Sequence, residues 1–286
     1  MRLPAPLARL AADRRRLVEL FVLSNLAFLV LDVWIAHSVN AFRHPLEWLP
    51  VVFAAAGSAV LAVAVAAGWR RRGALWRWLG HAVGWAAIAV GVGGLLLHLE
   101  GRFFQQTTLE GLVYSAPFAA PLAFAGLGFL LLADRMLPPG DASWGRWVLF
   151  FALGGFVGNF ALSLADHAQN GFFFAREWIS VAAAALAVGF LAVAVAKRRP
   201  NRALVAGCWW VLAAQVLVGL LGFAWHLAAA FEGPAESLAT NALYGAPLFA
   251  PLLFADLAAL AALGLWEVGV EDTATIRGGA ANEEAR

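Results

Sequence analysis

The chain has 286 residues, and the 62% that are hydrophobic exceed the roughly half expected of a soluble globular domain. The mean hydropathy of +0.76 likewise excludes an ordinary soluble domain. The formal net charge of +2 is small, and we expect no nucleic-acid partner. A single cysteine, Cys208, excludes an intrachain disulfide framework, a CxxC motif and a thiolate metal cluster. The sequence also contains no nucleotide-binding loop, nucleophile elbow or histidine–glutamate zinc-protease motif.

Runs of about 20 apolar residues recur along the chain, which is typical of membrane-spanning helices. We therefore predict an all-α polytopic membrane protein with eight transmembrane helices. The predicted spans are 17–38, 48–69, 76–98, 111–134, 145–167, 178–196, 203–227 and 241–267. Residues 1–16 are predicted to form a basic cytoplasmic arm, and 269–286 a disordered cytoplasmic tail. The first span is too long for a removable signal peptide and lacks a small-residue cleavage site.

The segment 114–125 recurs as 244–255, with eight of its twelve positions identical, including a tyrosine, two prolines and a phenylalanine. The same offset matches His37, Asn40, Phe42, Glu47 and Trp48 with His167, Asn170, Phe172, Glu177 and Trp178. An offset of 128 matches Gly91, Gly94 and His98 with Gly219, Gly222 and His226. The pattern predicts two tandem four-helix repeats, 17–140 and 141–268. Each repeat has an even number of spans, so we expect parallel repeats related by an axis along the membrane normal.

The basic residues are distributed very unevenly between the loops on the two sides of the predicted membrane. With the N-terminus in the cytoplasm, 17 of the 20 lie in inner segments, and the outer loops keep only Arg43, Arg102 and Arg176. Cytoplasmic loops of membrane proteins carry this excess of arginine and lysine. We therefore predict an integral membrane protein, placed in the bacterial plasma (inner) membrane with both termini cytoplasmic and the lipid bilayer as its main partner.

Polar residues in the first and fifth spans fall on one helix face. These residues are Asn25, Asp32 and His37 in one span, followed by Asn40, and Asn159, Ser163 and His167 in the other, followed by Asn170. Since polar groups are costly in lipid, this face should point into the bundle. Glu47 and Glu177 stand at the head of the next spans, where the positive end of the helix dipole favours a carboxylate.

The third and seventh spans carry the motif Gly-x-x-Gly-x-x-x-His, whose glycines share a face with the histidine. Such small residues admit either a neighbouring helix or a flat cofactor. The fourth and eighth spans contain Pro117 and Pro121, and Pro247 and Pro251, which should bend these helices because each proline removes a hydrogen bond. The eighth span adds Asp256, where the fourth has Gly126.

This topology brings two histidines, a glutamate and a tyrosine to one level near the outer face in each repeat. The first set is His37, His98, Glu47 and Tyr114, and the second is His167, His226, Glu177 and Tyr244. Two histidines on different helices of a four-helix unit can be axial ligands of haem b, with Gly91, Gly94, Gly219 and Gly222 beside the macrocycle. The histidines and glutamates can instead bind iron, copper or zinc. They can also simply close each bundle by hydrogen bonds.

The eight spans, the duplication and the outward-lying histidines resemble the tandem four-helix-bundle haem proteins, such as haem A synthase. In that family the histidines lie on even-numbered helices, whereas here they lie on odd-numbered ones, so no activity is transferred. The first functional hypothesis is a membrane redox or electron-transfer protein that works with other membrane redox subunits or a quinone. The alternative is a transporter of a small molecule or ion between the repeats, with Asp256, Asn40 and Asn170 as further polar candidates. An assembly subunit without chemistry would leave the duplicated histidines unexplained.

Overall fold

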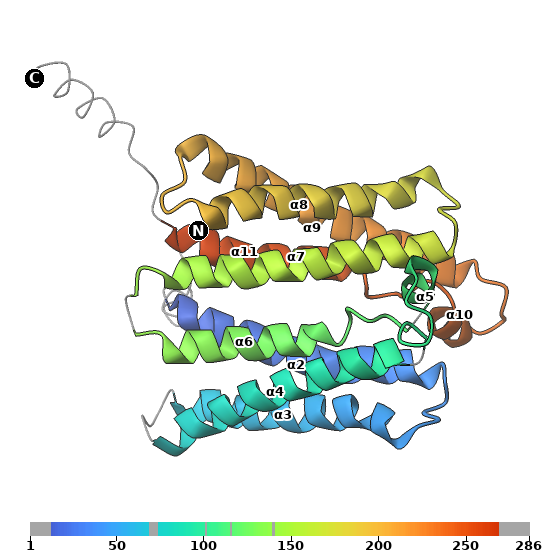
Figure 1. The fold of residues 1–286 in the computed structure, drawn as a ribbon, viewed down its shortest axis with the longest axis horizontal. Coiled ribbons are helices and arrows are strands. Elements are labelled where there is room, and N and C mark those ends of the chain that lie inside the picture. The colour runs from blue at the N-terminus through green and yellow to red at the C-terminus, as the bar shows by residue number, and fades with distance from the viewer. Residues whose placement is uncertain (1–12, 69–73, 101, 115, 139–140, 269–286) are drawn as a thin grey trace, which may run out of the picture.

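The computed structural model describes residues 13–68, 74–100, 102–114, 116–138 and 141–268, and this part of the chain forms helices and no β-strand (Figure 1). The long helices are α2 (Arg14–Ser38), α3 (Trp48–Gly68), α4 (Ala74–Glu100), α7 (Trp144–Gln169), α8 (Trp178–Ala196) and α9 (Arg202–Phe231). The shorter ones are α5 (Leu109–Val113), α6 (Leu122–Met136), α10 (Leu238–Tyr244) and α11 (Leu252–Glu267), with 3-10 turns η1 (Pro45–Glu47) and η2 (Ala175–Glu177). The tail 269–286 and most of the arm 1–16 lie outside the described residues, and α2 begins three residues before the predicted span.

Six helical segments of the described chain are long and apolar enough to cross a membrane. They are Arg14–Ser38, Pro45–Ala67, Ala74–Glu100, Trp144–Gln169, Ala175–Ala196 and Arg202–Phe231. The protein is therefore a helical integral membrane protein. By contrast, α6 and α11 have 15 and 16 residues, fewer than the ~20 that cross the hydrocarbon core unaided.

The two predicted spans with paired prolines are interrupted. The helices α5 and α10 end at Val113 and Tyr244, and α6 and α11 begin only after Pro121 and Pro251. Turns occupy 116–121 and 245–251. Two prolines four residues apart remove two helical hydrogen bonds within one turn and crowd the preceding carbonyls. The paired prolines were predicted to bend these helices, and the structure shows a complete break in each of the predicted spans 111–134 and 241–267.

The order of elements in residues 14–136, here called the first half, recurs in residues 144–267, the second half. The helices α2, α6, α7 and α11 pack around one another as an inner bundle, with α3 and α4 on one side and α8 and α9 on the other (Figure 1). The described chain begins and ends at one end of the molecule, and α5 and α10 lie at the opposite end. There α5 packs against α7 and α10 against α2, so each short helix contacts the first helix of the other half.

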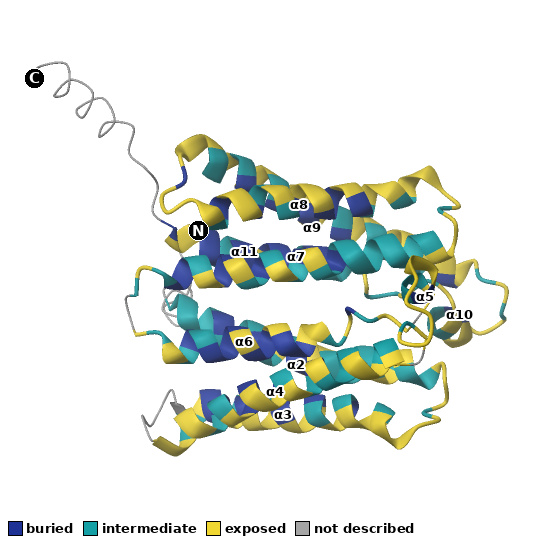
Figure 2. Cartoon of the chain, in the orientation of Figure 1, coloured by how far each residue is buried: buried dark blue, intermediate teal, exposed yellow. Residues whose placement is uncertain are grey.

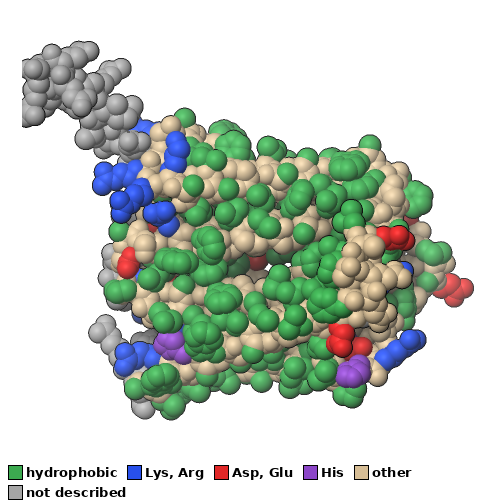
Figure 3. Space-filling model, in the orientation of Figure 1, with side chains coloured by type: hydrophobic (Ala, Val, Ile, Leu, Met, Phe, Trp, Pro, Cys, Tyr) green, Lys and Arg blue, Asp and Glu red, His purple; other side chains and the backbone are tan. Residues whose placement is uncertain are grey.

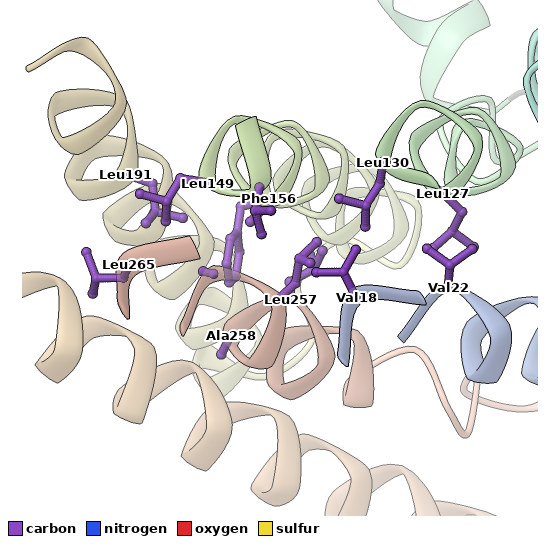
Figure 4. Close-up of a cluster of buried hydrophobic side chains, with 14 of the residues drawn as sticks. Val18, Val22, Leu127, Leu130, Leu149, Phe156, Leu191, Leu257, Ala258 and Leu265 are labelled. Atoms are coloured by element: carbon purple, nitrogen blue, oxygen red, sulfur yellow. The ribbon is translucent and has the colours of Figure 1, made fainter. Parts of the chain in front are cut away.

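Buried side chains concentrate in the inner bundle. Val22, Leu127, Phe156 and Leu257, one from each of its four helices, belong to one apolar cluster (Figure 4). The outward faces of the flanking helices are largely exposed (Figure 2), and many of their exposed side chains are large and apolar. An apolar exterior around a packed core is the distribution expected of helices surrounded by lipid.

Arginines gather at the end where the described chain begins and ends (Figure 3). Arg15 donates to the carbonyl oxygens of Asp134 and Leu137 at 2.8 Å. Arg135 pairs with Glu19 at 2.8 Å, and both side chains are largely buried. These contacts connect the start of α2 to the end of α6, which precedes the connection to the second half.

Candidate histidine site

The four duplicated histidines lie toward the ends of long helices at the α5–α10 end: three are in the last turn, and His226 lies five residues before the last residue of α9. His37 and His98 belong to α2 and α4, and His167 and His226 belong to α7 and α9. All four residues are partly buried. Successive long helices of each half run in opposite directions, so the first and third end at the same side of the molecule (Figure 1).

His37 and His98 converge in the first half. Their ring centroids are 6.3 Å apart, with an angle of 71° between the ring planes. His37 Nδ1 lies 3.0 Å from the carbonyl oxygen of Val33 in the preceding turn. His98 Nδ1 lies 2.9 Å from the carbonyl oxygen of Pro117 in the turn that interrupts the fourth predicted span. Both rings are therefore fixed by backbone oxygens.

The second half keeps one of these arrangements and changes the other. His226 Nδ1 lies 2.7 Å from the carbonyl oxygen of Pro247, which repeats the His98–Pro117 contact. His167 Nδ1 instead lies 3.6 Å from Oε2 of Glu177, an ion-pair distance that is too long for a hydrogen bond. His226 is close enough to His167 for an electrostatic interaction, but no ring contact joins the two within the described chain.

The backbone contacts define which ring nitrogen is available. A carbonyl oxygen only accepts, so Nδ1 of His37, His98 and His226 must donate a proton to it. In a neutral imidazole the lone pair is then on Nε2. No hydrogen-bond partner for Nε2 of these three rings is found among the described residues. A histidine that binds a metal through one nitrogen commonly donates its other N–H to a carbonyl or carboxylate in this way.

A stacked Phe–Trp pair follows the first histidine in each half. The rings of Phe42 and Trp48 are 4.0 Å apart, and those of Phe172 and Trp178 are 3.9 Å apart. Phe42 and Phe172 have φ angles of 48° and 51°, a left-handed conformation that is strained for a bulky residue. Their rings also lie about 6 Å from His37 and His167 respectively. The sequence matched these phenylalanines between repeats but did not predict them as site residues.

Glu47 and Glu177 end the 3-10 turns before α3 and α8, and both are half-buried. In each, the oxygen Oε2 is inaccessible and has no hydrogen-bond partner among the described residues. A buried carboxylate oxygen without a hydrogen bond is costly. In the second half this oxygen lies 3.6 Å from His167 Nδ1, whereas no such ion pair is found for Glu47 among the described residues.

The glycines that precede His98 and His226 pack against the neighbouring proline-bearing segments. A Cβ atom added to Gly94 would lie 2.8 Å from Cβ of Pro121, and one added to Gly222 would lie 2.8 Å from Cβ of Pro251. Gly91 and Gly219 similarly face the backbone at Ala125 and Ala255. Of the two expectations for this motif, the structure shows the close approach of a neighbouring helix. The space beside these glycines is filled by protein rather than open to a flat cofactor.

The remaining predicted polar candidates do not join the histidine pairs. Tyr114 and Tyr244 are exposed, and Arg102 stacks over the Tyr114 ring at 5.8 Å. Asn40 and Asn170 are exposed at the ends of α2 and α7. Asp256 lies in the inner bundle, where it accepts a hydrogen bond from Asn25 at 3.1 Å.

Each candidate set contains two histidines. Within the described ranges, no three histidine, cysteine, aspartate or glutamate side chains lie together as a metal-ion site would require. The carbonyls of Pro117 and Pro247 were not predicted as histidine partners, although the duplicated spacing of prolines and histidines marked both segments.

Comparisons of this chain with protein-family models, curated proteins and solved structures give no match. A functional proposal therefore rests on the residues and geometry described above.

Proposed function

We propose that this integral membrane protein binds a redox cofactor, haem b or a transition metal, at a histidine pair in each half. The observation that carries the proposal is the orientation of the rings. His98 and His226 donate Nδ1–H to equivalent proline carbonyls, and His37 donates to a helix carbonyl, which leaves Nε2 as the ligand atom. The histidine–proline contact is present in both halves, which favours ligation over an incidental polar contact.

A haem would bring its own ring nitrogens, so the histidine pair of each half would be the protein ligands that hold it. Against this version, the glycines that were expected beside the macrocycle pack against Pro121 and Pro251. The rings of His37 and His98 meet edge to face with a centroid separation of 6.3 Å, so the two side chains are close enough to act on one bound group. A bare iron, copper or zinc ion needs further ligands at about 2 Å, and the nearest duplicated candidates are Glu47 and Glu177. When bound, haem, iron or copper would supply electron transfer, whereas zinc, which has no redox chemistry, would not.

The proposed topology places both sites near the outer face of a bacterial plasma membrane. We count α5 with α6, and α10 with α11, as single interrupted crossings, which makes eight crossings in two parallel repeats. The arginine-rich end would be cytoplasmic by the distribution of basic residues (Figure 3). A quinone or another membrane redox subunit is then the expected electron partner.

The test is the visible spectrum of purified full-length protein, with metal analysis of the same sample. A Soret band that weakens in His98→Ala and His226→Ala, but not in His81→Ala, would support haem. His81 is the matched control because it lies on α4 at the opposite end and contacts its own helix at Arg77. Stoichiometric iron, copper or zinc without a Soret band would support a bare metal. Colourless, metal-free protein expressed with haem and metals supplied would refute the proposal.

Transport between the halves is the second candidate, favoured by one observation. The Asn25–Asp256 hydrogen bond joins helices of the two halves inside the bundle, and buried polar residues in membrane proteins commonly mark substrate paths. If the protein is a transporter, the purified protein should be colourless and metal-free, and vesicles that contain it should take up a solute or an ion.

A further inference from the structure

We infer that Asp256 is a proton-binding site between the two halves of the protein. This inference goes beyond the proposed cofactor and does not depend on it, since Asp256 lies away from the histidine pairs. The proton comes from water that reaches the carboxyl group, and the carboxylate oxygen gains the proton that the water gives up.

The backbone of α11 aims Asp256 at α2. Its neighbours Ala255 and Leu257 occupy the other two sides, because Ala255 faces Gly219 of α9 and Leu257 faces Gly155 of α7. Asp256 accepts a hydrogen bond from Asn25 Nδ2 at 3.1 Å. The same Nδ2 atom donates to the carbonyl oxygen of Phe21 at 3.0 Å, which fixes the amide. The carboxyl group therefore has a fixed position at the junction of the halves.

The surroundings of Asp256 favour its neutral form. Its side-chain partner is an uncharged amide, and the adjacent Leu257 and Ala258 belong to the buried apolar cluster. A carboxylate without a cation is costly in such an environment, and binding a proton removes its charge. The hydrogen bond from Asn25 remains possible in both states, because a protonated carboxyl group retains an acceptor oxygen.

A second polar group indicates that water or a comparable acceptor reaches this region. Asn159 of α7 is only 5% exposed, and its Nδ2 finds no acceptor among the described residues. Asn159 lies one turn from Gly155, on the face of α7 that packs against Leu257. An unmade hydrogen bond at a buried amide is costly, and an ordered water molecule would satisfy it. On the side of the molecule drawn in Figure 3, a narrow opening lies near the centre, and an acidic side chain is visible inside it.

The face of α2 that carries Asn25 also carries a second carboxyl group, nearer the α5–α10 end. Asp32 lies seven residues after Asn25, on the same face of α2. The helices that pack against α11 are α2, α7 and α9. Their titratable or charged side chains are Arg14, Arg15, Arg16, Glu19, Asp32 and His37 on α2, Arg146, Asp166 and His167 on α7, and Arg202, Cys208 and His226 on α9. Asp256 forms no ion pair with any described residue, so a bound proton would neutralise its charge.

Infrared spectroscopy of the full-length protein in lipid nanodiscs tests this inference directly. We expect a carboxylic-acid carbonyl band at about pH 7 that shifts in D₂O and again when the aspartates carry carboxyl ¹³C. Asp256→Asn should remove this band, and it preserves side-chain volume and an oxygen for Asn25. Asp32→Asn is the matched control, and the band should survive in it. Raising the pH should convert the wild-type band into a carboxylate band.

Asn25→Leu provides a second readout that leaves Asp256 in place. Loss of the amide donor should move the acid band to higher frequency. A spectrum without an aspartic-acid band at neutral pH would overturn the inference, as would a band unchanged in both Asp256→Asn and Asn25→Leu. A carboxylate response to Na⁺ at constant pH would also overturn it, in favour of a metal-cation site. Because these bands do not depend on a Soret absorption, failure here and failure of the cofactor proposal are distinguishable.

Discussion

The ring nitrogen Nδ1 of His98 lies 2.9 Å from the carbonyl oxygen of Pro117. In a continuous helix this oxygen would accept the backbone N–H of residue 121, but Pro121 has none. It accepts instead from Ala120 N and from the histidine. His226 and Pro247 repeat the contact at 2.7 Å, with Pro251 four residues on. The spacing of the paired prolines thus provides the acceptor that orients each histidine.

Pro121→Ala should weaken the first histidine site. The new N–H at residue 121 can pair with the carbonyl of Pro117 and compete with His98, while the smaller side chain loosens the contact with Gly94. We expect a lower cofactor content for the first site, measured by absorbance or metal analysis per chain. Pro251→Ala is the matched control and should affect only the second site. Equal loss of both sites in either variant would contradict this role for the prolines.

Gly91→Ala should destabilise the protein by about 1–3 kcal/mol, because the added methyl group would collide with the backbone at Ala125. Gly93 lies on the same helix and has open space around its Cβ position, so Gly93→Ala should be tolerated. Thermal unfolding in detergent compares the two variants. Similar stabilities for both would show that the close approach of α4 and α6 contributes little.

The helical membrane class could be predicted from the sequence, because the length of the apolar runs and the positions of the basic residues are visible without any knowledge of tertiary contacts. The convergence of His37 with His98 could be predicted from the repeat, since helices of similar length end at the same level. The sequence predicted a bend at each proline pair, whereas the helices stop at Val113 and Tyr244. Two prolines four residues apart remove two backbone hydrogen bonds, and the helix does not continue through them. The sequence grouped Glu177 with His167, which the structure brings to 3.6 Å, but the contact of His37 with the Val33 carbonyl could not be predicted because the equivalent rings take different partners.

Glu177→Gln should affect the second site more than Glu47→Gln affects the first. Glu177 Oε2 lies 3.6 Å from His167 Nδ1, whereas His37 Nδ1 is held by a backbone oxygen. A carboxylate beside a ligand histidine strengthens its ligation, and its loss typically costs about 10–100-fold in metal affinity. The affinities of the two variants are compared by titrating cofactor-free protein with haem or with the metal that the wild-type protein binds. Equal effects of the two variants would argue against a specific His167–Glu177 interaction.

Asp141 should make a small, pH-dependent contribution to stability. The hydroxyl and backbone N–H of Ser143 both donate to Asp141 Oδ1 at 2.7 Å, and these bonds hold the pKa of the carboxyl group below its usual range. Since the folded-state pKa is the lower one, the stabilisation is complete above the unfolded-state pKa and disappears as the pH falls through the folded-state value. Asp141→Asn should therefore lower Tm slightly at neutral pH but not at a pH below the folded-state pKa of Asp141. A difference in Tm that stays constant with pH would contradict this.

The most direct test of the central claim is the number of cofactors bound per chain. The account predicts two per wild-type chain, one in His98→Ala, one in His226→Ala and none in the double variant, measured by haem or metal content against protein concentration. The double variant must remain folded, as judged by its helical circular dichroism and a single gel-filtration peak. A wild-type chain without a cofactor, or a folded double variant that retains both, would contradict the account.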